Sequence, residues 1–70
     1  FDNYYYFIND GDLWINKKQW DNAIFQYKKA LELFPDDYNT LYRLTLAYSY
    51  KCSYENEDCA KGLKLINRLL

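Results

Sequence analysis

Residues 23–35 read AIFQYKKALELFP, and this stretch decides how the chain folds. Ala23, Tyr27 and Ala30 recur at helical spacing, so their side chains share one face of a helix. The two alanines are small enough for a neighbouring helix to approach closely, and Tyr27 fills the gap between them. Pro35 cannot continue the helix, because its ring clashes with the preceding turn. The segment is therefore predicted to be a helix that packs against another helix and ends before the proline.

With Gly11 and Trp14 upstream, this stretch resembles the tetratricopeptide repeat (TPR), a helix-turn-helix unit of about 34 residues. The resemblance covers nearly the whole chain, as two repeats. It implies an all-α fold, an α-α superhelix of two antiparallel helix pairs that stack as a short right-handed solenoid segment. Proteins of this family bind other proteins and do no chemistry. We therefore expect a protein-binding module that is not an enzyme and has no cofactor.

An internal repeat agrees with this organisation. Shifting the sequence by 34 residues aligns Gly11 with Thr45, and a shift of 39 residues aligns Ala23 with Gly62. The second repeat thus carries five extra residues between its two helices (39 minus 34). We expect one domain over residues 1–70, with repeats at about 3–36 and 37–70.

Four helices are predicted, over residues 3–16, 19–34, 38–51 and 58–70. Asp2 is expected to cap the first helix, and Asp36 or Asp37 the third. The residues of the fourth helix that are predicted to pack inward are Leu63, Ile66, Leu69 and Leu70. Because the last turn lacks a polar capping face, either further chain or a homo-oligomer through this open C-terminal end is expected to cover it.

The resemblance implies that the first helix of each repeat lines a concave surface. On the first helix, Phe7, Gly11 and Trp14 are expected to face inward, which leaves Tyr5 and Ile8 on the opposite face. The predicted partner-binding groove consists of Tyr5, Ile8, Asn9, Asp12, Asn39, Tyr42, Arg43, Leu46 and Tyr50. This set is apolar and aromatic with polar edges, and soluble monomers seldom expose such a set without a partner. The groove is expected to bind a protein or peptide. The alternative is an architectural segment whose groove is filled by its own chain or by a second copy.

One subset of the family grips the C-terminal carboxylate of heat-shock chaperones with lysines and asparagines. Here Ile8 stands where that subset has a lysine, and Asp12 and Arg43 stand where it has asparagines. Because Asp12 would repel a carboxylate, this kind of ligand is not favoured.

Cys52 and Cys59 flank the five extra residues, so a disulfide between them would pin the enlarged loop. The alternative is two free cysteines, one or both packed at the turn. If the disulfide forms, the protein is expected outside the cytoplasm. A zinc site is not favoured, because two sulfurs with no histidine do not complete a structural site. A catalytic thiol is not favoured either, because no base stands ready to activate it.

The amino-acid composition disfavours several classes of function. Nine basic and ten acidic residues give a net charge of −1, and the charges are spread along the chain without blocks. Nucleic acid is therefore not an expected partner, and RNA binding by a helical repeat is kept only as an alternative. The chain has no histidine, which removes the commonest general base. No apolar run approaches the length of a membrane-spanning helix, so no membrane partner is expected.

Overall fold

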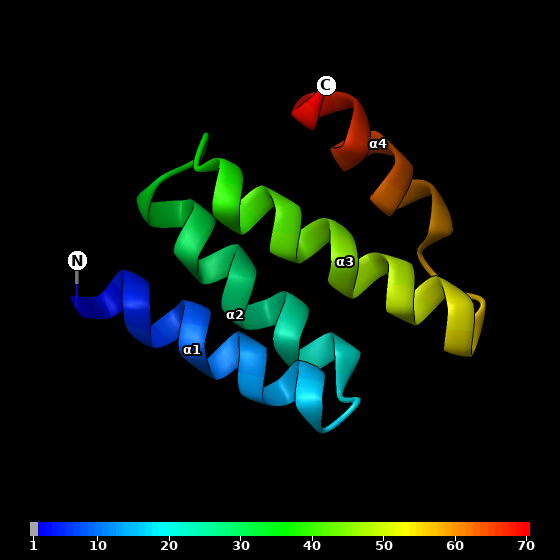
Figure 1. Ribbon diagram of the computed structural model, residues 1–70, viewed down its shortest axis with the longest axis horizontal. Helices are drawn as coiled ribbons and strands as arrows, with labels where there is room; N and C mark the ends of the chain where they lie inside the picture. The colour runs from blue at the N-terminus through cyan, green and yellow to red at the C-terminus, as the bar shows by residue number, and fades with distance from the viewer. Residues whose placement is uncertain (1) are drawn as a thin grey trace.

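The computed structural model describes residues 2–70 as four helices that lie side by side in chain order (Figure 1). Their bounds are α1 (Asp2–Asn16), α2 (Trp20–Leu33), α3 (Tyr38–Glu55) and α4 (Cys59–Leu69). In Figure 1, α1 and α4 form the two outer edges of the molecule, with α2 and α3 between them. The predicted all-α fold is confirmed, and each of the four predicted helices is present. The largest difference is that α3 extends beyond the predicted end at residue 51.

The ends of α3 follow from local hydrogen bonds. Asp37 is the N-cap, and its side chain accepts a hydrogen bond from the Thr40 N–H at 2.9 Å. At the other end, Asn56 adopts the left-handed conformation with φ 56°, and its N–H bonds to the Cys52 carbonyl. Asparagine is one of the few residues that tolerate this conformation, which is a common way to end a helix. Of the two predicted caps, Asp37 caps the helix and Asp36 is exposed.

Asp37 also ties α1 to the start of α3. The Tyr4 hydroxyl donates to the Asp37 carboxylate at 2.6 Å, and the Thr40 hydroxyl donates to the same oxygen at 2.5 Å. Burial acts to raise the pKa of Asp37. The hydrogen bonds from the Thr40 hydroxyl, the Tyr4 hydroxyl and the Thr40 N–H outweigh it and hold that pKa below its ordinary value.

Replacing Asp37 with alanine should therefore lower the free energy of unfolding by about 1–2 kcal/mol at neutral pH. Because the folded-state pKa is depressed, the contribution is fully present above the unfolded-state value of 3.8 and is lost as pH falls through the folded-state value. Urea unfolding of both proteins at neutral and acidic pH measures this. A wild-type advantage that stays constant below about pH 3 would contradict the assigned role of the carboxylate.

The core lies where α2 contacts α1 and α3. Ala23 and Ala30 are completely buried and Tyr27 is 2% exposed, as the spacing of these three residues predicted. A Cβ atom added at Gly11 would overlap the Tyr27 ring, lying 2.7 Å from Cδ1 and 2.9 Å from Cζ. Glycine at position 11 is thus what lets α1 approach the tyrosine on α2.

Two expectations about helix faces are wrong. Ile8 is only 5% exposed and belongs to the core, because it lies three residues before Gly11 and therefore shares its face. On α4, the inward face is formed by Gly62 and the partly buried Leu65 and Leu69. The other three residues predicted to pack inward on α4, namely Leu63, Ile66 and Leu70, are 63%, 37% and 97% exposed.

The face of α4 follows from the contact at Gly62. The position where a Gly62 Cβ atom would lie is 3.3 Å from the Tyr48 Cβ atom, so α4 approaches α3 closely there. Residues three and seven positions after Gly62 share its face, whereas Leu63 and Leu70 lie on a neighbouring face. Association of two copies through this uncovered face stays a prediction.

Candidate functional site

A groove between α1 and α3 contains part of the predicted binding surface. Its volume is about 300 Å³. The residues that line it are Asp12, Ile15, Asn16, Tyr27, Arg43, Leu46 and Tyr50. Four of these were predicted from the sequence. We call this set the α1–α3 groove.

A polar cluster crosses the α1–α3 groove. The Tyr27 hydroxyl donates a hydrogen bond of 2.5 Å to one oxygen of Asp12, and the Arg43 guanidinium forms an ion pair with the other oxygen. The Nε atom of Arg43 also donates to the Asn39 side-chain oxygen at 3.2 Å. Asp12 is therefore paired and does not present an isolated negative charge.

The same contacts shift the pKa values of Tyr27 and Arg43. Burial, followed by the hydrogen bond to Asp12, raises the pKa of Tyr27 far above its ordinary value of 10.0. For Arg43, burial acts to lower the pKa, but the hydrogen bond and negative charge of Asp12 raise it overall. At neutral pH the groove thus offers a neutral phenol and a paired cation.

Apolar side chains of α3 are exposed in the groove, at Leu46 and Tyr50, and beside it, at Tyr42. Tyr42, Leu46 and Tyr50 are 48%, 37% and 39% exposed, which is high for residues of this size. Tyr50 is held in place, because its ring stacks on Trp20 with the ring centroids 5.1 Å apart. Tyr54 stacks on Trp20 as well, at 5.5 Å. The groove is therefore bordered by aromatic side chains, and stacking on Trp20 holds two of them, Tyr50 and Tyr54, in position.

The remaining predicted residues are placed differently. Ile8 is in the core and cannot contact a ligand. Tyr5 is 58% exposed but lines a separate hollow of about 590 Å³, formed with Tyr4 and residues 33–37. Asn9 and Asn39 are exposed without lining the α1–α3 groove.

Sequence reasoning missed three lining residues, namely Ile15, Asn16 and Tyr27. The sequence predicts Tyr27 in the core, which is correct for its ring. Its hydroxyl nevertheless reaches Asp12 at the groove. A tyrosine, rather than a phenylalanine, at the centre of an apolar stripe was the available signal, because a buried hydroxyl needs a polar partner.

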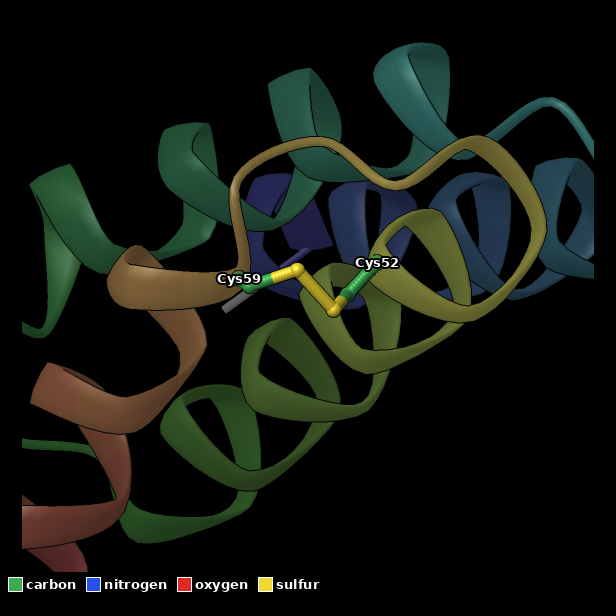
Figure 2. The surroundings of a disulfide bond; sticks show 2 residues. All are labelled: Cys52 and Cys59. Atoms are coloured by element: carbon green, nitrogen blue, oxygen red, sulfur yellow. A yellow bond between two sulfur atoms is a disulfide. The ribbon is translucent and has the colours of Figure 1, made fainter.

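The predicted disulfide joins the end of α3 to the start of α4. Figure 2 shows Cys52 and Cys59 pointing toward each other, with the connecting loop curving around them. Their Cα atoms are 4.9 Å apart. The disulfide is thus confirmed over the alternative of free cysteines. It also means that Cys52 presents no thiol in this state.

An ion-pair network involves the residues next to the two cysteines, Lys51 and Asp58. The Lys51 ammonium lies 2.6 Å from Asp21 of α2 and 2.8 Å from Asp58 of the loop. Hydrogen bonds to Asp21 and Asp58 raise the pKa of Lys51 well above its ordinary value, and the bond from Lys51 lowers that of Asp58. Lys51 therefore connects α2, α3 and the loop that the disulfide closes.

Residues 2–70 show neither a metal-ligand cluster nor a membrane-spanning helix. Residues 2–70 contain no cluster of three or more side chains that could hold a metal ion. Within the same range, each helix is too short or too polar to cross a bilayer. Comparison with known proteins yields no matching family model, no matching curated protein and no matching solved structure.

Proposed function

We propose that this protein is a TPR-like protein-interaction module that binds a protein or peptide at the α1–α3 groove. The observation that carries the proposal is the exposed apolar surface of Tyr42, Leu46 and Tyr50 beside the paired charges of Asp12 and Arg43. Interfaces are enriched in tyrosine and arginine, and their binding energy is concentrated in a few such residues.

The packing supports the TPR resemblance. In α1 and α2, a glycine faces a large aromatic residue that lies between two buried alanines, in the order that the resemblance implies. The helix pairs α1–α2 and α3–α4 then correspond to the two proposed repeats. Membership of that family remains part of the proposal.

The chemistry of the groove suggests its ligand. Tyrosine rings and Leu46 favour an apolar side chain, while Asn16 and Arg43, which line the groove, offer polar atoms that can bond to a peptide backbone or a side-chain oxygen. The charges of Asp12 and Arg43 balance each other, so this groove lacks the excess positive charge that RNA binding needs. A peptide with a central apolar residue and polar flanks fits best.

Affinity capture with two matched baits tests the proposal. The first bait carries Tyr42→Ala and Leu46→Ala, which remove apolar contact area beside the groove and within it, without touching the Asp12–Arg43 pair. The control bait carries Tyr6→Ala and Phe25→Ala, which remove two aromatic rings that are 60% and 58% exposed and do not line the groove. We expect a partner that wild type and the control capture and that the first bait loses.

The proposal requires the loss to be specific to the groove. Circular dichroism of all three baits should show the same helical content, because each substituted side chain is exposed. If the first bait retains every protein that wild type captures, the α1–α3 groove is not the binding surface. If the control bait also loses the partners that wild type captures, the binding surface is not confined to this groove.

A further inference from the structure

A second groove lies between α2 and α4, above the middle of α3. Its volume is about 310 Å³. Its apolar floor consists of Leu31, Leu44, Tyr48 and Leu65, and its rim of Lys28, Lys61, Lys64 and Arg68. We call it the basic groove.

The rim concentrates positive charge in a chain whose net charge is −1. Four of the nine lysine and arginine residues line the basic groove, and among residues 2–70 no aspartate or glutamate does. Lys61, Lys64 and Arg68 lie along one side of α4, because residues spaced by three and seven share a face. Lys28 contributes from α2. Lys28 is far in the sequence from the three cations of α4, and the packing of α4 brings them together.

The cations remain available to a ligand. Arg68 lies 3.5 Å from Asp36, and Lys61 lies 3.5 Å from Asp58, which binds Lys51 more closely at 2.8 Å. Long ion pairs at the surface contribute little to stability, so carboxylates of a ligand can replace them. The Lys28 ammonium lies over the Tyr48 ring, 6.0 Å from its centroid. Such a contact leaves its hydrogen-bond donors free to meet an anion.

We propose that the basic groove binds an acidic amphipathic segment of a protein partner. Leucine-like side chains of the segment would cover the floor, and its glutamates or aspartates would pair with the four cations. Such a ligand would contact both the apolar floor and the cationic rim, whereas a phosphate backbone would contact the rim alone. Tyr48 is only 4% exposed, so its ring offers no platform on which a nucleic-acid base could stack.

This surface is distinct from the α1–α3 groove. Leu44 and Tyr48 lie on one face of α3, and Arg43, Leu46 and Tyr50 lie on another, as the helical repeat requires. A ligand at the basic groove therefore does not need the first groove to be functional. Failure of either proposal leaves the other standing.

Fluorescence anisotropy with synthetic peptides tests the proposal. The probe is a labelled amphipathic peptide of leucine and glutamate at helical spacing, with two comparison peptides in which every glutamate is glutamine or every leucine is serine. Lys28→Glu/Lys64→Glu should weaken binding of the probe at least about tenfold. The control is Lys17→Glu/Lys29→Glu, which changes the net charge equally outside the groove and should leave the affinity within about twofold of wild type.

A second variant distinguishes a loss of binding from a loss of folding. Lys28→Gln/Lys64→Gln removes the charges without reversing them, and its circular dichroism spectrum should match that of wild type while its affinity for the probe falls. Equal loss in the control variant would overturn the proposal, because the effect would then reflect net charge alone. Undiminished binding of either comparison peptide would overturn it as well. Tighter binding of a single-stranded RNA than of the probe would assign the groove to nucleic acid instead.

Discussion

Replacing Tyr27 with alanine should lower the free energy of unfolding by about 3–5 kcal/mol, the range measured for deleting a large buried aromatic side chain. The ring is 2% exposed, lies against Gly11 and is packed into the core of α1, α2 and α3. Its loss also removes one of the two hydrogen bonds that Asp12 accepts, because the Arg43 guanidinium is the other donor. A domain of this size has a total stability of only about 5–10 kcal/mol. We therefore expect the variant to be partly or largely unfolded, as measured by urea titration of the circular dichroism signal.

Tyr27→Phe separates the two contributions of this residue. It keeps the ring and removes only the hydroxyl, so the expected loss is about 1 kcal/mol. Phe25→Ala is the matched control, because Phe25 lies on the same helix and is 58% exposed, and its loss should stay below about 1 kcal/mol. Equal destabilisation by Tyr27→Ala and Phe25→Ala would show that Tyr27 is not the centre of the core.

Removing the disulfide with Cys52→Ser/Cys59→Ser should lower the free energy of unfolding by about 2–3 kcal/mol on the chain-entropy model. Reduction of the wild-type protein should have the same effect. The loss should appear first in α4, because this helix packs chiefly against α3. Hydrogen exchange of the α4 amides, with and without a reducing agent, measures it.

The double-serine variant is also the control for the reducing agent, which should not change its exchange rates. If reduction leaves the wild-type exchange of α4 unchanged, then the Lys51 network and the packing of Leu65 suffice to hold the helix. A large effect would instead agree with a protein that folds in an oxidising compartment, where disulfides persist.

The sequence predicted the core of the first helix pair well. Small residues at 23 and 30 around Tyr27, and the proline after them, leave few other ways for this segment to pack. The disulfide could also be anticipated, since both cysteines flank the five extra residues. These features depend on the spacing of residues within one segment, and that spacing can be read from a single sequence.

Errors arose where the answer depends on how far a helix is rotated about its axis. Ile8 lies three residues before Gly11 and four before Asp12 and is a neighbour of both on the helix surface, so a small difference in rotation moves it from a groove into the core. On α4, the contact between Gly62 and Tyr48 fixes the rotation and leaves Leu63 exposed. The basic groove was missed for another reason. Lys28 and the cations of α4 belong to different proposed repeats, and only tertiary packing places them around one floor.

The stack of Trp20 with Tyr50 and Tyr54 gives the molecule an internal optical reporter. Trp20 is 6% exposed, yet Tyr50 on its flank lines the α1–α3 groove. Anything that shifts Tyr50 alters the surroundings of the indole and hence its emission. With Trp14→Phe removing the other indole, the fluorescence of Trp20 alone would report occupancy of that groove without an attached dye.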